Sequence, residues 1–360
     1  MKKLELGEEY PPKGEEKDIE KINRLIEGFM RKQYEASNNR PAKRCVHSKS
    51  PGCLKGTFVV LEDIPIQAKT GLFKQPGIYE CWLRYSNGSQ FIRHDKKPDV
   101  RGLSIKVMGV EGEKIMEEKR DALTQDFMFL NSKNFPVGNL KDFARFTKWF
   151  LTKNFTYGYP IGFILRRWLQ MVSLIKNIRR KVLNPLGVPF YSSTAYKWGD
   201  HAVKYFLYPA LPISMESIDT SKPDYLQMAI KNTLKKGSVS FDFMLQFQKD
   251  PYKMPVEDSS VVWDEKLSPF IKVGSVIIAN QDFTSSKHQE YCEDLSFSTW
   301  HSLPEHRPLG GTNRSHRTSY LISSGLRHEF NGTEDIEPEG FVDYDQFIQR
   351  NGEKTESVNH

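Results

Sequence analysis

The sequence predicts an α+β protein built on an antiparallel β-barrel of about eight strands, with appended helices and a helical insertion. One observation is a set of short runs rich in β-branched and aromatic residues, each bounded by Gly, Pro, Asn or Asp, which is typical of strands. Another is that segments with helical spacing precede, interrupt and follow these runs. Closing the sheet would remove its exposed edges, so we expect a ligand at the barrel's mouth or outside, under the helices. The 360 residues suit one large domain or two ordinary ones, and 12% aromatic content argues against disorder.

The first 40 residues are predicted to form an arm and a helix. Residues 1–17 are polar and contain two prolines, so we expect a loose arm there. From Asp18 to Glu35 apolar residues recur at helical spacing, and an Asp is a favoured N-cap. We therefore expect the helix to begin after Asp18.

Residues 41–330 are predicted to form the barrel domain, with the helical insertion at about 139–182. Its strand-like runs are 56–64, 79–86, 103–110, 126–130, 239–247 and 270–279. A loop and a helix are expected at 214–235. A loop-rich stretch at 298–313 then leads into a helix at 314–330.

The net charge of +7 is unevenly distributed. Residues 141–181 contain ten Lys/Arg and one Asp, mixed with aromatic and aliphatic side chains, which predicts amphipathic helices. Two interpretations remain open: a docked helical hairpin with a solvated basic face, or contact with a membrane surface or a lipid substrate. The residues 331–360 are acidic and predict a peripheral C-terminal tail. No zinc-finger spacing or RNP-type motif is present, so we do not expect nucleic acid as a partner.

Cysteine and histidine spacing gives little support for a metal site or a disulfide scaffold. The four Cys include no CxxC pair, and the histidines form no HExxH motif or ligand triad. The N-terminus shows no apolar core of the kind found in signal peptides. We therefore expect a cytoplasmic protein, with membrane association left open through residues 141–181.

Several motifs occur in a family-specific order. The run 44–58 places Arg44, Val46 and His47 ahead of a glycine-containing turn into a strand. It resembles the haem catalases, in which the distal histidine sits in an Arg-x-Val-His-(small)-Lys-Gly segment that leads into the first barrel strand. Arg84-Tyr85-Ser86 resembles the family's Arg-Phe-Ser, and residues 99–106 resemble its Asp-x-Arg-Gly-Phe-Ala-x-Lys. The resemblance extends from about residue 44 to 327, and it is closest to the short catalase-related haem peroxidases.

On the distal side, the resemblance implies that His47, Asn131 and Ser86 are catalytic. His47 would move a proton between the two peroxide oxygens as general base and then acid. Asn131, at the end of a segment matching Asp-Leu-x-x-x-Asn, would donate a hydrogen bond to the peroxide, and Ser86 would fix the His47 tautomer. Val46 and Phe135 would form a narrow apolar wall.

On the proximal side, the resemblance implies a haem b whose iron is ligated by Tyr320. The haem propionates would be bound by Arg44, Arg84 and Arg327, the last of which lies seven residues after the tyrosine. The family also has an Arg four residues before the tyrosine, where it holds the phenol as phenolate. In this sequence that position is His316, a weaker charge partner, and the neighbouring Arg317 is the alternative support.

The resemblance therefore implies a haem peroxidase or catalase-like oxidoreductase. It would reduce or disproportionate hydrogen peroxide or organic hydroperoxides, with an unidentified electron donor, in the response to oxidative stress. Two alternatives remain: rearrangement or cleavage of fatty-acid hydroperoxides, as in the allene oxide synthase kind of catalase relative, and a non-catalytic haem- or lipid-binding role. Val46 favours peroxide chemistry, because the lipid-converting relatives tend to have Thr before the distal His. Catalase relatives are often homo-oligomers.

Overall fold

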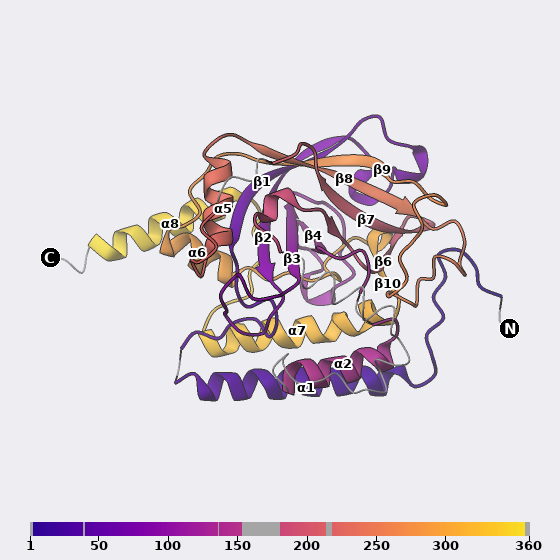
Figure 1. Ribbon diagram of the computed structural model, residues 1–360, viewed down its shortest axis with the longest axis horizontal. Coiled ribbons are helices and arrows are strands. Elements are labelled where there is room, and N and C mark those ends of the chain that lie inside the picture. Colours follow the sequence, from indigo (N-terminus) through magenta and orange to yellow (C-terminus); the bar gives the residue numbers. More distant parts are fainter. Residues whose placement is uncertain (1–2, 39, 136, 153–180, 214–217, 357–360) are drawn as a thin grey trace.

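The computed structural model describes residues 3–38, 40–135, 137–152, 181–213 and 218–356 (Figure 1). Eight antiparallel strands close into a barrel in the order β1-β2-β3-β4-β5-β7-β8-β9, and β9 pairs back with β1. The strands of this ring are β1 (Gly52–Val60), β2 (Gly77–Asn87), β3 (Arg101–Met108), β4 (Thr124–Leu130), β5 (Phe190–Tyr191), β7 (His201–Pro209), β8 (Val239–Phe247) and β9 (Ile271–Ile278). Two further strands, β6 (Ala195–Trp198) and β10 (Pro308–Leu309), continue from β7. The predicted fold class and barrel are thereby confirmed.

The barrel interior is filled by side chains. Phe58, Phe73, Phe127 and Phe243 contact one another with ring centroids 5.2–6.4 Å apart, and Tyr205 packs against Phe127 and Phe243. All five are at most 2% exposed. An eight-stranded barrel is just wide enough for such a core. A cofactor must therefore bind outside the barrel lumen.

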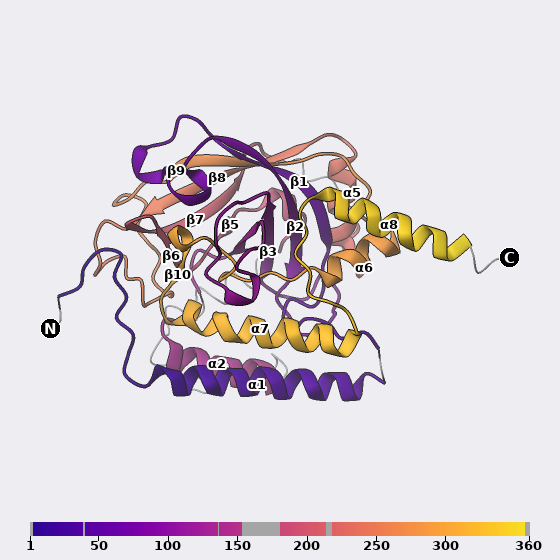
Figure 2. The same cartoon turned by 180° about the vertical axis from the view of Figure 1, so that it is seen from behind.

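Three helices form a layer against one end of the barrel: α1 (Glu15–Ala36), α2 (Leu140–Thr152) and α7 (Gly311–Asn331) (Figures 1 and 2). Ile22 and Met30 of α1 are buried in this layer, where α1 packs against both α2 and α7. The remaining α-helices, α5 (Tyr225–Leu234), α6 (Ser286–Asp294) and α8 (Phe341–Glu356), lie beside the barrel. Single 3-10 turns occupy Ile66–Ala68, Gly71–Phe73, Glu117–Lys119, Pro185–Gly187 and Pro304–His306.

The predicted elements agree with the structure where the sequence pattern was local. Each of the six predicted strands is present, with ends shifted by at most four residues. The N-cap prediction at Asp18 is wrong, because α1 begins at Glu15 after Gly14, which adopts a left-handed conformation with φ of 75°. Asp18 instead lies in the acidic first turn, where its charge favours the helix dipole.

The predicted insertion at 139–182 and amphipathic segment at 141–181 are described only in part. Residues 140–152 form α2, and residues 153–180 lie outside the described residues. Among the helices that the structure describes, none is long and apolar enough to cross a bilayer. The two interpretations of this segment therefore remain predictions.

The prediction of a peripheral C-terminal tail is wrong for the start of that segment. Asp335 and Glu337 contact Lys119 and a fully buried Lys106, and the chain then forms α8. Acidic composition alone suggested a solvated tail. The charges are instead used to neutralise buried lysines.

Candidate active site

A cavity of about 290 Å³ lies between the barrel and the helix layer. Most of its wall is apolar, with Phe129 from β4 and several side chains of α2 among the lining residues. Its polar lining includes most of the residues predicted from the sequence: Arg44, His47, Arg84, Ser86, His316, Tyr320 and Arg327. Segments far apart in the chain therefore meet at one site, on the side of the barrel where a ligand was expected.

His47 is held in a fixed orientation at the barrel side of the cavity. Its Nδ1 lies 2.9 Å from Ser86 Oγ, and its backbone adopts the left-handed region with φ of 58°. Gly102 lies against the ring, since a Cβ there would be 2.7 Å from Ser86 Oγ and 2.8 Å from the imidazole. Burial, assisted by Arg84 and Arg44, lowers the pKa of His47 to about 4. The imidazole is thus neutral at pH 7, and its Nε2 can accept a proton when Ser86 bonds a protonated Nδ1.

The structure does not bring Asn131 to the cavity wall. Its Oδ1 accepts a hydrogen bond from the Arg101 N–H at 2.8 Å, and it is absent from the described residues that line the cavity. In this part of the chain the cavity is instead lined by Asn134, whose Nδ2 donates to the Ser260 carbonyl at 3.0 Å. The Asn131 side chain is instead hydrogen-bonded to the backbone at the start of β3.

Val46 and Phe135 both line the cavity, as predicted. The ring of Phe135 packs edge-on against Phe143 of α2, with centroids 5.4 Å apart. It also lies 6.3 Å from the ring of His316, so it links the two sides of the site. This part of the wall is apolar.

Tyr320 faces the cavity from α7, and His316 lies one turn earlier on the same helix. The two rings stack with centroids 4.7 Å apart and planes inclined by 11°. Burial raises the pKa of Tyr320 well above its usual value, with a smaller contribution from Tyr196. Burial also lowers the pKa of His316 to about 4, so this residue is neutral at pH 7 and supplies no positive charge to the phenol.

Neither nearby arginine replaces that missing charge. Arg317 is exposed, its guanidinium lies 5.6 Å from the Trp300 ring centroid, and it is absent from the described cavity lining. The alternative that Arg317 supports the phenol is therefore wrong, because Arg317 lies on the exposed face of α7. Arg314 is bound to three carboxylates of other segments: Glu9, Glu15 and Glu257.

The three predicted anion-binding arginines, Arg44, Arg84 and Arg327, converge at one part of the cavity wall. Burial and mutual repulsion lower the pKa of Arg84 and of Arg327 to about 9. The carboxylate of Glu293 lies 3.4 Å from Arg44 and 3.5 Å from Arg84. Sequence reasoning missed Glu293, because its partners are about 30 to 250 residues away and no motif contains it.

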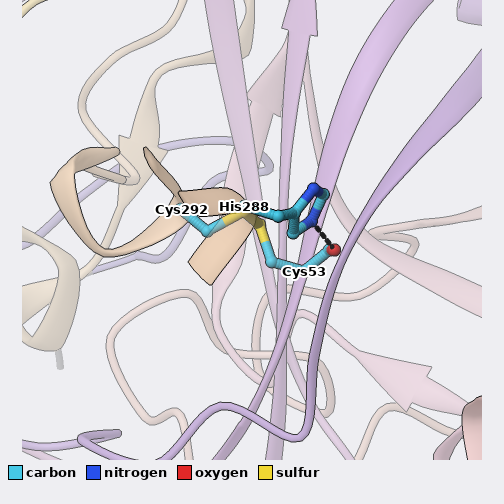
Figure 3. A group of neighbouring side chains, drawn as sticks. All are labelled: Cys53, His288 and Cys292. Carbon is cyan, nitrogen blue, oxygen red and sulfur yellow. Dashed lines mark hydrogen bonds between the residues drawn. A yellow bond between two sulfur atoms is a disulfide. The ribbon is translucent and has the colours of Figure 1, made fainter. Parts of the chain in front are cut away.

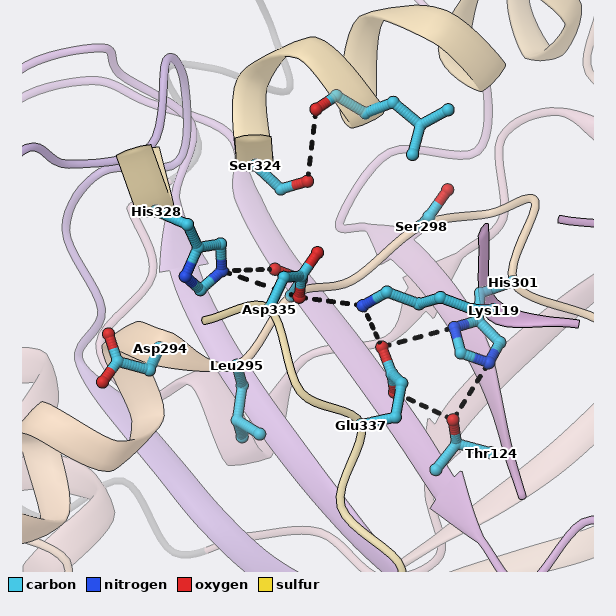
Figure 4. A network of polar contacts seen from close by, with 12 residues as sticks. Lys119, Thr124, Asp294, Leu295, Ser298, His301, Ser324, His328, Asp335 and Glu337 are labelled. Carbon is cyan, nitrogen blue, oxygen red and sulfur yellow. Dashed lines mark hydrogen bonds and ion pairs between the residues drawn. The ribbon is translucent and has the colours of Figure 1, made fainter. Parts of the chain in front are cut away.

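A largely buried polar network lies beside α7 (Figure 4). Glu337 accepts hydrogen bonds from Lys119 at 2.6 Å and from Thr124 Oγ1 at 2.8 Å, while Asp335 accepts one from Lys119 at 2.8 Å. Lys106 pairs with Asp126 at 2.8 Å and with Glu337 at 2.5 Å; its side chain is fully buried, and that of Lys119 is 10% exposed. No local pattern in the sequence indicates these long-range pairs.

Cys53 and Cys292 form a disulfide beside His288 (Figure 3). This single bond joins α6 to β1, although the cysteine spacing gave little support for a disulfide scaffold. His288 Nε2 lies 2.7 Å from the Cys53 carbonyl oxygen, and Nδ1 lies 3.1 Å from the Tyr344 hydroxyl. With both sulfurs paired and both nitrogens hydrogen-bonded, the cluster offers no free metal ligand.

Comparisons with known proteins agree with this architecture. No model of a known protein family matches the chain. A catalase of Methanosarcina barkeri is 24% identical over 267 residues, which cover 67% of this chain and 50% of that protein. The chain thus spans about half the length of this curated relative.

Solved catalases share the fold. Catalase A of Saccharomyces cerevisiae superposes with a TM-score of 0.62 at 18% identity, and covers 85% of this chain and 67% of its own. A fungal catalase gives a TM-score of 0.61 at 17% identity, and a bacterial catalase gives 0.57 at 15% identity. Their matches cover 85% and 86% of this chain, and 65% and 63% of theirs. The chain therefore has the fold of the catalases and is similar to a catalase in sequence, as its motifs indicate.

Proposed function

We propose that this protein is a haem b-dependent enzyme that reduces or disproportionates hydrogen peroxide or small organic hydroperoxides. The observation that carries the proposal is that His47, oriented by Ser86, and Tyr320 line the same largely apolar cavity. One of these residues suits proton transfer and the other suits iron ligation. The cytoplasmic setting, the electron donor and any homo-oligomer remain part of the proposal.

The donor set of the cavity fits a haem. Arg84 Nε is buried without a hydrogen-bond partner in the described structure, and Arg44 Nη1 has only a 3.4 Å contact with the Glu293 carboxylate, although most buried polar atoms are hydrogen-bonded. Both belong to residues at the cavity wall, together with Arg327. Haem carboxylates would supply the acceptors, and Tyr320 would supply the axial oxygen ligand.

When bound, haem supplies the iron and the capacity to store oxidising equivalents. The chain's own residues would handle the protons. Nε2 of the neutral His47 would accept the proton of one peroxide oxygen and return it to the other, while Ser86 keeps the ring in place. The apolar wall around Val46 and Phe135 would exclude water from this transfer.

The proximal side favours peroxidase over rapid catalase turnover. Without a cation at position 316, Tyr320 keeps a raised pKa in the protein alone. A phenol that ionises less readily donates less electron density to the iron. We therefore propose weak oxygen release and dominant oxidation of an added donor.

The test is spectroscopic and kinetic. The purified protein is supplemented with haem, its visible spectrum is recorded, and it is mixed with hydrogen peroxide, with and without an oxidisable dye. We expect a ferric haem spectrum and dye oxidation, and His47→Ala should lose the turnover while retaining the spectrum. No haem spectrum would exclude both haem-dependent functions. Haem binding without turnover would favour a non-catalytic role for the site, and full turnover of His47→Ala would show that His47 does not carry the proton transfer.

A second candidate is conversion of fatty-acid hydroperoxides. It is favoured by the apolar roof of the cavity, to which α1 contributes Ile26 and α2 contributes Phe143, Phe146, Phe150 and Leu151. Comparing the two peroxides on the same haem-loaded sample separates the candidates. Faster consumption of the lipid hydroperoxide than of hydrogen peroxide would overturn the first proposal.

A further inference from the structure

Glu293 places a negative charge inside the arginine cluster of the cavity. Its carboxylate lies 3.4 Å from Arg44 Nη1, 3.5 Å from Arg84 Nη2 and 3.3 Å from Lys43 Nζ. Burial alone would raise the pKa of Glu293, but the nearby Arg44, Arg84 and Lys43 lower it to about 2. The carboxylate is therefore ionised at neutral pH and already pairs with two of the arginines at the cavity wall, although Glu293 is not itself among the described lining residues.

The backbone around Glu293 is held against the same arginines. Glu293 lies in the last turn of α6, where carbonyl groups have no partner within the helix. Arg44 and Arg327 donate hydrogen bonds to carbonyls of this turn and of the residue after it. The Cys53–Cys292 disulfide fixes the adjacent residue to β1. The carboxylate is thus positioned at the cluster by its backbone.

Two opposing consequences follow from this charge. The cluster of Arg44, Arg84 and Arg327 carries three positive charges, which Glu293 reduces to a net two. In the protein without cofactor, the carboxylate relieves repulsion among the buried guanidinium groups. A dianionic ligand entering the cluster therefore meets less attraction, because two of its arginines are already paired with a carboxylate.

We propose that Glu293 is an internal counterion that competes with the haem carboxylates for the arginine cluster and thereby limits the affinity for haem. The inference rests on the proposed function, because the competing ligand is the cofactor. Glu293 stabilises the empty site and weakens cofactor binding. It is a positioning residue for the arginines and has no part in the proton transfer.

The experiment compares the wild type with Glu293→Gln, which removes the charge and keeps the shape. The dissociation constant for haem is measured by titration of its absorption band, and the melting temperature is measured without haem. We expect Glu293→Gln to bind haem about tenfold more tightly, which corresponds to 1.4 kcal/mol, and to melt several degrees lower without it. The matched control is Glu290→Gln, an exposed carboxylate on the same helix, which should change neither quantity.

Haem dimethyl ester separates this effect from a general change in the cavity, because it lacks free carboxylates. The wild type and Glu293→Gln should bind the ester equally. Unchanged or weaker haem binding by Glu293→Gln, or an equal gain for the ester, would overturn the inference while leaving the proposed function intact.

Two further outcomes remain interpretable. If the wild type fails to bind haem at all, the proposed function itself is overturned. If Glu293→Gln does not fold, Glu293→Asp retracts the carboxylate by one methylene. Glu293→Asp should then give a smaller gain in haem affinity than expected for Glu293→Gln. If Glu293→Asp gives no gain, the inference is overturned.

Discussion

His316 is the residue at which this chain departs most clearly from the catalase motif. It stacks on Tyr320, but it is neutral at pH 7, and its buried Nδ1 has no hydrogen-bond partner in the described structure. A guanidinium in its place would put a permanent charge beside the phenol. In the proposed haem site, Tyr320 would therefore lack a neighbouring positive charge at position 316 to support its phenolate.

We expect His316→Arg to increase oxygen release from hydrogen peroxide by about tenfold, because a cation beside Tyr320 lowers the pKa of the phenol. Oxygen evolution and the spectrum of the haem-loaded protein check this, with Glu329→Gln on the exposed face of α7 as control. An unchanged rate in a folded, haem-bound variant would show that phenolate support does not limit turnover.

Gly102 is required by the close approach of β3 to the His47 ring. We expect Gly102→Ala to displace His47 from Ser86, because its methyl group would lie 2.7–2.8 Å from both side chains. Peroxide turnover should fall at least tenfold, and the free energy of unfolding should drop by about 1–3 kcal/mol through overpacking. Activity assays and urea denaturation measure the two effects.

The control for this substitution is Gly28→Ala on α1, where an added Cβ meets nothing within 4 Å. It should raise helix stability by roughly 0.5–1 kcal/mol and leave turnover unchanged. A folded Gly102→Ala with full activity would contradict the steric role assigned to Gly102.

Among the elements, those with a strong local pattern were predictable from the sequence. β8 was predicted at its observed bounds, because its alternation and flanking turns are contained in nine residues. β7 was missed, because six successive residues from Ala202 to Leu207 are buried and leave no alternation to recognise. The predicted cavity residues came from motif order, whereas Glu293 depends on contacts made only after α6 docks.

The segment that leads to α8 likewise could not be predicted from a local sequence pattern, because its ion pairs are long-range. Glu337 pairs with Lys106, which is fully buried, and with Lys119. We expect Glu337→Gln to cost about 3–5 kcal/mol of unfolding free energy, because it leaves buried ammonium groups undercompensated. Chemical denaturation of Glu337→Gln checks this. The exposed neighbour Glu339→Gln should stay within about 0.5 kcal/mol of the wild type, and equal effects of both variants would contradict the buried role.

For the whole molecule, folding buries histidines both at the cavity under the helix layer and in the barrel core. His47 and His316 line the cavity, while His306 lies against Trp198 and Phe73 of the core. Burial lowers the pKa of each, to about 4 for the first two and to about 3 for His306. Folding therefore keeps these imidazoles unprotonated at pH values where the unfolded chain would bind protons.

This linkage predicts a loss of stability on acidification. Between pH 6.5 and about 4 the unfolded state binds more protons at these histidines than the folded state, so the unfolding free energy must fall as the pH decreases through that window. The raised pKa values of Asp99, Asp126 and Asp294, which burial causes, oppose this trend, because these carboxyl groups bind protons more readily in the folded state. Urea denaturation of the haem-free protein at pH 7, 5.5 and 4.5 should show the unfolding free energy decreasing by several kcal/mol.

His306→Asn should be less stable than the wild type at pH 7 but lose less unfolding free energy on acidification, because one buried imidazole no longer titrates. A flat stability profile across this range would show that the buried histidines become protonated without unfolding the protein.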